Sequence, residues 1–86
     1  MTTETNTATT DDRRIDAAQR IESDLIHKVY LATGEDGQTW FASDSWTEFK
    51  RRANTVARAY GVSQAEILDN CLEYGRQLAA EYYAAN

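Results

Sequence analysis

The sequence predicts an α+β fold in a single small domain: an N-terminal helix, a β-hairpin, and then a pair of helices. Three observations predict it. Apolar residues recur at helical spacing over 15–26 and again from residue 46 onward. Two β-prone runs, 28–33 and 38–43, flank a short loop bounded by glycines. The chain of 86 residues contains no proline, so nothing in it forces these elements to break.

The first elements are expected to be a tail and a helix. Residues 1–10 are almost all Thr, Asn, Ala and Glu, which is typical of a flexible polar tail. A helix is expected over 11–27, with its inner edge marked by Ile15, Ala18, Glu22 and Leu25. His27 falls at its end, where positive charge complements the helix dipole, so this histidine is interpreted as a helix-end residue and not as a ligand or base.

A β-hairpin is expected over residues 28–43. The two runs are joined by the loop Gly34–Gly37, and a glycine-bounded loop of four residues is typical of a hairpin connection. Antiparallel pairing would set Tyr30 opposite Phe41 and Leu31 opposite Trp40. Each face of the ribbon would then carry an aromatic side chain and need cover.

Two helices are expected over 46–60 and 64–83. Each follows an S-x-x-E capping box, in which the Ser hydroxyl and the Glu carboxylate satisfy backbone amides at a helix start: Ser45–Glu48 and Ser63–Glu66. Gly61 between them supplies a left-handed turn that ends the first helix. The apolar residues of the first helix lie on one face: Trp46, Phe49, Ala53, Val56, Ala57 and Tyr60.

The last helix predicts a homodimer. Its apolar arc is so wide that we expect it to be buried on two sides, and a chain this small buries too little surface to be comfortably stable alone. The expected dimer interface consists of Trp40, Phe41, Leu68, Leu72, Gly75 and Leu78. Gly75 is less favourable than Ala in a helix by about 1 kcal/mol. We therefore expect another helix to cross closely at this position.

A second pattern runs through the same pair of helices. An apolar residue and Ala precede the helix-ending Gly, and a capping Ser, a Glu and two apolar residues follow: Val56, Ala57, Gly61, Ser63, Glu66, Ile67 and Leu68. This pattern resembles the core of the ribbon-helix-helix repressors of the Arc, CopG and MetJ type, and the resemblance covers about residues 39–84.

The resemblance implies a small dimeric transcriptional regulator that binds DNA. A strand over 39–44 would pair with that of the second copy and enter the major groove. Backbone amides at the start of the second helix would contact a phosphate, for which the matching positions are Val62, Ser63 and Gln64. A cationic strip on the first helix would support them: Lys50, Arg51 and Arg58.

Charge indicates an alternative function. The net charge is −5; residues 1–38 carry four basic and eight acidic side chains, and residues 39–86 carry five and six. DNA affinity depends on cations that neutralise phosphates, yet the outward residues of the expected strand are Trp40, Ala42 and Asp44. The alternative is an acidic protein of the phage or plasmid type that binds and inhibits a host protein without binding DNA.

Neither an enzyme nor a metal or cofactor site is expected. One His and one Cys form no spacing-specific constellation with other titratable residues. Cys71, on the apolar stripe of the last helix, has no second cysteine to pair with, which favours a reducing compartment. No signal peptide opens the chain and no apolar run approaches the length of a membrane span. We therefore expect a cytoplasmic protein.

Overall fold

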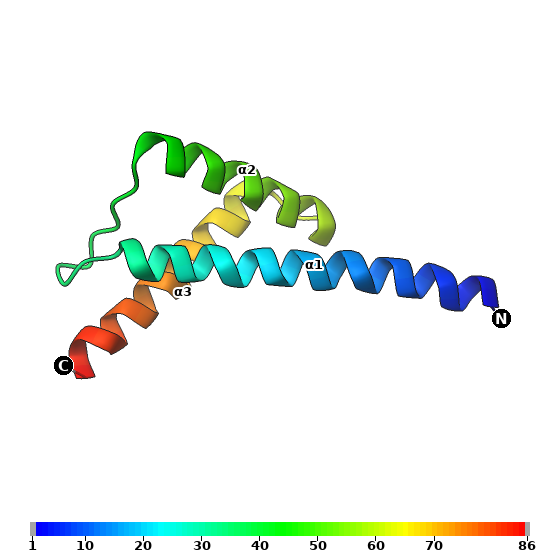
Figure 1. Cartoon of the computed structure of the whole chain (residues 1–86), viewed down its shortest axis with the longest axis horizontal. Helices are drawn as coiled ribbons and strands as arrows, with labels where there is room; N and C mark the ends of the chain where they lie inside the picture. The colour runs from blue at the N-terminus through cyan, green and yellow to red at the C-terminus, as the bar shows by residue number, and fades with distance from the viewer. Residues whose placement is uncertain (1, 86) are drawn as a thin grey trace.

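The structure, a computed structural model, describes the backbone of residues 2–85 and the side chains of residues 12–85. It consists of α1 (Thr2–Ala32), α2 (Ser43–Tyr60) and α3 (Gln64–Ala85). Helix α2 runs back alongside α1, and α3 starts beside α2 and crosses α1 obliquely (Figure 1). Every pair of helices is in contact, so the core lies where all three meet.

The predicted α+β fold is wrong, because the described residues form three helices and no strand. Residues 28–32 continue α1, and α2 begins at Ser43. Leu25 and Val29 are both fully buried, and the free energy of burying them on one helical face outweighs the β-propensity of the sequence that follows. The expected pairing of Tyr30 with Phe41 is absent, since Tyr30 contacts Tyr82 of α3.

The segment around the expected hairpin turn, residues 33–39, forms a loop closed by a single β-bridge. Thr33 and Thr39 form an isolated antiparallel bridge, and the Gly34 N–H donates to the carbonyl of Gln38 at 2.9 Å. Gly37 has φ +79°, a left-handed conformation that suits glycine. The glycine-bounded turn that the sequence predicts is therefore present, but it joins α1 to an irregular linker and does not join two strands.

Helix α1 begins earlier than expected. Its backbone includes residues 2–10, which the sequence assigns to a flexible tail, and the side chains of that segment lie outside the described residues. Ala18 is the first buried residue among the described side chains of α1. Figure 1 shows that the N-terminal turns extend past both other helices. Flexibility of this segment stays a prediction.

The turn between α2 and α3 has the features that its sequence indicates. Gly61 ends α2 at φ 73° and ψ 32°, and its N–H donates to the carbonyl of Ala57. The Ser63 hydroxyl oxygen accepts the Glu66 N–H at 3.2 Å, as the second capping box predicts. The first capping box is not used: α2 starts at Ser43, its N-cap residue forms no side-chain cap, and Ser45 lies within the first turn.

The core is compact and rich in small residues. Its large, fully buried side chains are Phe49, Leu25, Ile67, Val29, Val56 and Cys71. Gly75 lies at the crossing of α1 and α3, where a Cβ atom would come within 2.5 Å of Val29 Cγ1 and 2.8 Å of the Ile26 carbonyl oxygen. The close crossing predicted at Gly75 is therefore present, and both helices belong to one chain.

Candidate functional site

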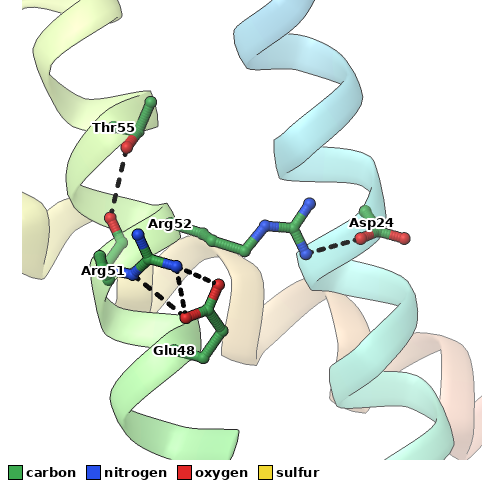
Figure 2. Close-up of polar contacts among 5 residues, drawn as sticks. All are labelled: Asp24, Glu48, Arg51, Arg52 and Thr55. Atoms are coloured by element: carbon green, nitrogen blue, oxygen red, sulfur yellow. Dashed lines mark hydrogen bonds and ion pairs between the residues drawn. The ribbon is translucent and has the colours of Figure 1, made fainter.

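The expected cationic strip on α2 is largely engaged within the chain. Arg51 donates to both carboxylate oxygens of Glu48, with the closest contact at 2.6 Å, and Arg52 donates to Asp24 of α1 at 2.8 Å (Figure 2). Lys50 places its ammonium 5.9 Å from the centre of the Trp46 ring. These contacts reduce the charge that α2 presents to a phosphate backbone.

Arg58 differs from Arg51 and Arg52 because it forms no ion pair among the side chains of residues 12–85; it is exposed and lines a groove of about 320 Å³ together with Arg14 of α1. The floor of this groove is apolar, with Ala17, Ala18, Ile21 and Ala59 among its lining residues. Of the strip predicted from the sequence, Arg58 is thus the cation best placed to meet an external anion.

The ion pairs shift the pKa values of their carboxylates. The hydrogen bond from Arg52 is the main cause that holds the pKa of Asp24 below its usual value. The hydrogen bond from Arg51 likewise lowers the pKa of Glu48, and Glu48 in turn raises the pKa of Arg51. Both carboxylates are therefore ionised at neutral pH.

The Asp24–Arg52 pair should stabilise the protein only while Asp24 is ionised. Because the pKa of Asp24 is lower in the folded state, this contribution is present above the unfolded pKa and is lost as pH falls through the folded pKa. The side chains of Arg52 and Asp24 are 28% and 51% exposed, so solvent screening limits the coupling energy to about 1 kcal/mol.

A double-mutant cycle of Asp24→Asn and Arg52→Gln checks this expectation by urea denaturation at several pH values. The coupling energy should fall from neutral pH towards about pH 3. A coupling energy that stays constant over that range would contradict the assignment of the pair. The Glu48–Arg51 pair is intact in all four proteins of the cycle, so its own titration cancels from the coupling energy.

The residues expected to contact a phosphate hold the turn between α2 and α3. The Val62 N–H donates to the Ala57 carbonyl at 3.0 Å, and Gln64 Nε2 donates to the Lys50 carbonyl at 2.7 Å. Ser63 caps α3, as described above. Each of the three residues thus has a structural role in this chain, and a phosphate contact stays a prediction.

The residues expected at a dimer interface divide into two groups. Phe41, Leu68 and Leu72 pack against the core and are half-buried, and Gly75 is buried beneath α1. Trp40 and Leu78 are exposed at 70% and 45%. The structure therefore uses most of the predicted interface inside one chain.

Leu78 belongs to an exposed row on α3 that we call the α3 stripe: Tyr74, Leu78 and Tyr82, at 55%, 45% and 51% exposure. Residues spaced by four follow one another along a helix face. Tyr82 also contacts the rings of Tyr30 and Tyr83, and these three aromatic residues line a hollow of about 170 Å³ with Leu31 and Thr33. The apolar surface thus continues from α3 onto the end of α1.

Acidic residues border the α3 stripe. Glu73 and Glu81, with the uncharged Gln77 between them, each precede a member of the stripe by one position and so form the next row on the helix. The other charged side chains of α3 are Glu66, Asp69 and a single cation, Arg76. The sequence placed Tyr74 and Tyr82 on an apolar arc, but sequence spacing does not tell which part of that arc another helix covers.

Cys71 and its surroundings favour a structural role. Burial is the main cause that raises the pKa of the Cys71 thiol to about 11, and Glu22 adds to the shift, so the thiol is neutral at physiological pH and a poor nucleophile. The Tyr60 hydroxyl donates to Glu22 at 3.2 Å. Desolvation and the charge of this carboxylate raise the pKa of Tyr60.

Among the described residues, no group of three or more His, Cys, Asp or Glu side chains is placed to hold a metal ion. No helix within residues 2–85 combines the length and apolarity required to cross a bilayer. No protein-family model matches the chain, and neither curated proteins nor solved structures give a significant match.

Proposed function

We propose that this protein is a small acidic binding module that docks a protein partner on the α3 stripe and does not bind DNA. The observation that carries the proposal is the exposure of Tyr74, Leu78 and Tyr82, which lie on α3 next to its buried face. Tyrosine combines a large apolar body with a polar tip and is enriched at protein interfaces. A row of such side chains is therefore suited to contact a protein.

The size of the surface fits a protein partner. A large side chain buries roughly 150–250 Å², so the exposed parts of the stripe, Tyr83 and Leu31 together offer on the order of 500 Å². A standard interface buries about 800 Å² on each partner, of which somewhat more than half is apolar. The surface around the α3 stripe is thus large enough to form the apolar part of one standard interface.

The charges around the stripe indicate the chemistry of the partner. Glu73 and Glu81 border it, and the whole chain carries a net charge of −5. Complementary charges speed association and exclude partners of like charge. The expected partner is accordingly a protein with an apolar patch bordered by Lys or Arg, which suits an acidic inhibitor of a host protein.

The same observations give less support to DNA binding as the function. A ribbon-type regulator reads the major groove with a strand, and the described residues contain none. Arg51 and Arg52 are paired with carboxylates, which weakens their ability to neutralise phosphates. DNA binding stays a prediction of the resemblance, and the experiment below includes it as a competing outcome.

The test compares three forms of the full chain as bait in nuclease-treated host lysate: wild type, Leu78→Glu and the matched control Gln77→Glu. Both substitutions add one carboxylate at an exposed position of α3, but only the first lies on the stripe. We expect a partner that wild type and Gln77→Glu retain and that Leu78→Glu loses. The purified partner should bind the wild type directly, with an affinity that falls as salt rises.

Several outcomes would overturn the proposal. Equal capture of the partner by Leu78→Glu would show that the stripe is not the contact. In a parallel capture from untreated lysate, one enriched DNA site that nuclease treatment removes would assign the function to a regulator. Sedimentation of the wild type as a dimer that Leu78→Glu converts to a monomer would show that a second copy covers the stripe. Far-UV circular dichroism verifies that both variants fold.

A further inference from the structure

A separate pocket lies between the linker, α2 and the middle of α3. Its volume is about 460 Å³, and its lining residues are Thr39, Phe41, Ser43, Trp46, Leu72 and Arg76. The Phe41 ring stacks on Trp46 with centroids 5.7 Å apart, and Leu72 adds an aliphatic surface. The pocket thus combines apolar walls with two hydroxyl groups and one guanidinium.

The guanidinium of Arg76 is held by a chain of hydrogen bonds. Arg76 Nε donates to Thr39 Oγ1 at 3.1 Å, and the Thr39 and Thr33 hydroxyl oxygens lie 2.7 Å apart. The Thr33 hydroxyl donates to the Val29 carbonyl at 2.7 Å. Since a hydroxyl has one proton, Thr39 must donate to Thr33 and accept from Arg76. This direction fixes Nε of Arg76 towards the protein.

The terminal amino groups of Arg76 remain available to a ligand. Among the side chains of residues 12–85, Arg76 forms no ion pair, whereas Arg51 and Arg52 each do. Glu73 stands one helical turn before Arg76, yet the guanidinium bonds to Thr39 instead. Thr33 is buried at 4% exposure, so the far end of the hydrogen-bond chain is anchored in the core.

We propose that this pocket binds a carboxylate attached to an apolar body. The two carboxylate oxygens would accept from the planar guanidinium of Arg76, a geometry that arginine provides and lysine does not. The apolar body would lie against Phe41, Trp46 and Leu72. Arg76 is the one cationic side chain among the lining residues of this pocket, which favours a monoanion over a phosphate dianion. The pocket volume falls within the range of small-ligand sites.

The ligand carboxylate has two possible sources, a free organic acid or the C-terminal residue of a polypeptide. The pocket is independent of the proposed function, because Leu72 and Arg76 lie on the opposite flank of α3 from Tyr74 and Leu78. Failure of one proposal therefore leaves the other standing.

The test uses the full chain with Trp40→Phe, which leaves Trp46 as the only tryptophan and as the fluorescence reporter. The probes are N-acetylphenylalanine and its uncharged amide. We expect saturable binding of the acid, with an affinity at least about tenfold higher than that of the amide, because hydrogen bonds to charged groups discriminate by about that factor or more. Peptides that end in Phe with a free or amidated terminus distinguish the source: tighter binding than the free acid assigns a polypeptide terminus.

Variants separate the role of Arg76 from general charge. Arg76→Gln should weaken binding of the acid about tenfold without changing that of the amide, and Arg76→Lys should recover only part of the loss. Thr39→Val removes the acceptor that orients Arg76 and should weaken binding several-fold. Arg58→Gln, which removes an exposed cation on α2, should have no effect.

Equal affinity for the acid and the amide would overturn the proposal, as would an affinity for the acid that Arg76→Gln leaves unchanged. Absence of saturable binding of both the acid and the peptides would overturn it as well. Far-UV circular dichroism of each variant verifies that the three helices are retained.

Discussion

Replacing Gly75 by Ala should lower the free energy of unfolding by about 2 kcal/mol. The added Cβ would lie within 2.5 Å of Val29 Cγ1 and 2.8 Å of the Ile26 carbonyl oxygen, so α1 and α3 would have to move apart. In an unobstructed helix, the same substitution stabilises by about 1 kcal/mol. The sign of the effect therefore tests the close crossing itself.

Chemical denaturation followed by far-UV circular dichroism measures this effect. Gln77→Ala, at an exposed position two residues along α3, serves as the control and should change stability by no more than about 0.5 kcal/mol. Val29→Ala should cost less in the Gly75→Ala background than in the wild type, because it removes the Cγ1 atom that the new methyl group would meet. It should not return the protein to wild-type stability, because the Val29 Cβ and the Ile26 carbonyl would still obstruct that group. If Gly75→Ala proved as stable as the wild type, the helices would not cross where the structure places them.

Replacing Phe49 by Ala should cost about 3–5 kcal/mol, the range for removing a buried aromatic side chain. Phe49 is 2% exposed, and its ring lies 5.3 Å from that of Phe41 and 5.5 Å from that of Trp46, measured between centroids. A chain of 86 residues is expected to have a total stability of about 4–13 kcal/mol. The loss is therefore a large part of the whole, and the variant should unfold at much lower denaturant concentration.

The control for Phe49→Ala is Trp40→Ala, which removes a larger aromatic side chain that is 70% exposed. Its effect should be well below that of Phe49→Ala, since little apolar surface returns to water. Thermal unfolding followed by circular dichroism compares the two. A loss below about 1 kcal/mol for Phe49→Ala would mean that the aromatic stack contributes little to the core.

The aromatic stack links the fold to the candidate pocket. Phe49 supports Phe41 and Trp46 from within the core, and these two residues form the apolar wall beside Arg76. The position of Phe41 is not one that a strand would give it, because the linker carries it back onto α2. The sequence therefore does not predict the pocket, because it assigns Phe41 to a hairpin and Leu72 to a dimer interface.

The charged residues illustrate a similar limit. The sequence indicates that Arg51 and Arg58 share a helix face, but it does not show that Glu48 engages the first of them. The ion pair between Asp24 and Arg52 joins residues from different helices. The Asp24–Arg52 pair depends on how α1 and α2 are aligned. Both ion pairs reduce the positive charge that α2 can present to DNA.

Local signals determined the turn between α2 and α3 without help from the rest of the chain. Gly61 adopts the left-handed conformation and Ser63 caps α3, because both effects act within a few residues of backbone. The helical periodicity of the later segments also predicted α2 and α3 close to their observed bounds, 43–60 and 64–85.

Only the tertiary structure decided the fold class, the continuation of α1 and the exposure of the α3 stripe. Residues 28–32 have β-prone side chains, yet they are helical because Leu25 and Val29 are buried by residues far along the chain. Tyr74 and Leu78 are exposed because α1 crosses α3 at Gly75 and leaves that flank uncovered. Local propensities differ by about 1 kcal/mol or less per residue, whereas burying one large apolar side chain contributes about 1.5–3 kcal/mol, so packing between distant segments prevails where the two conflict.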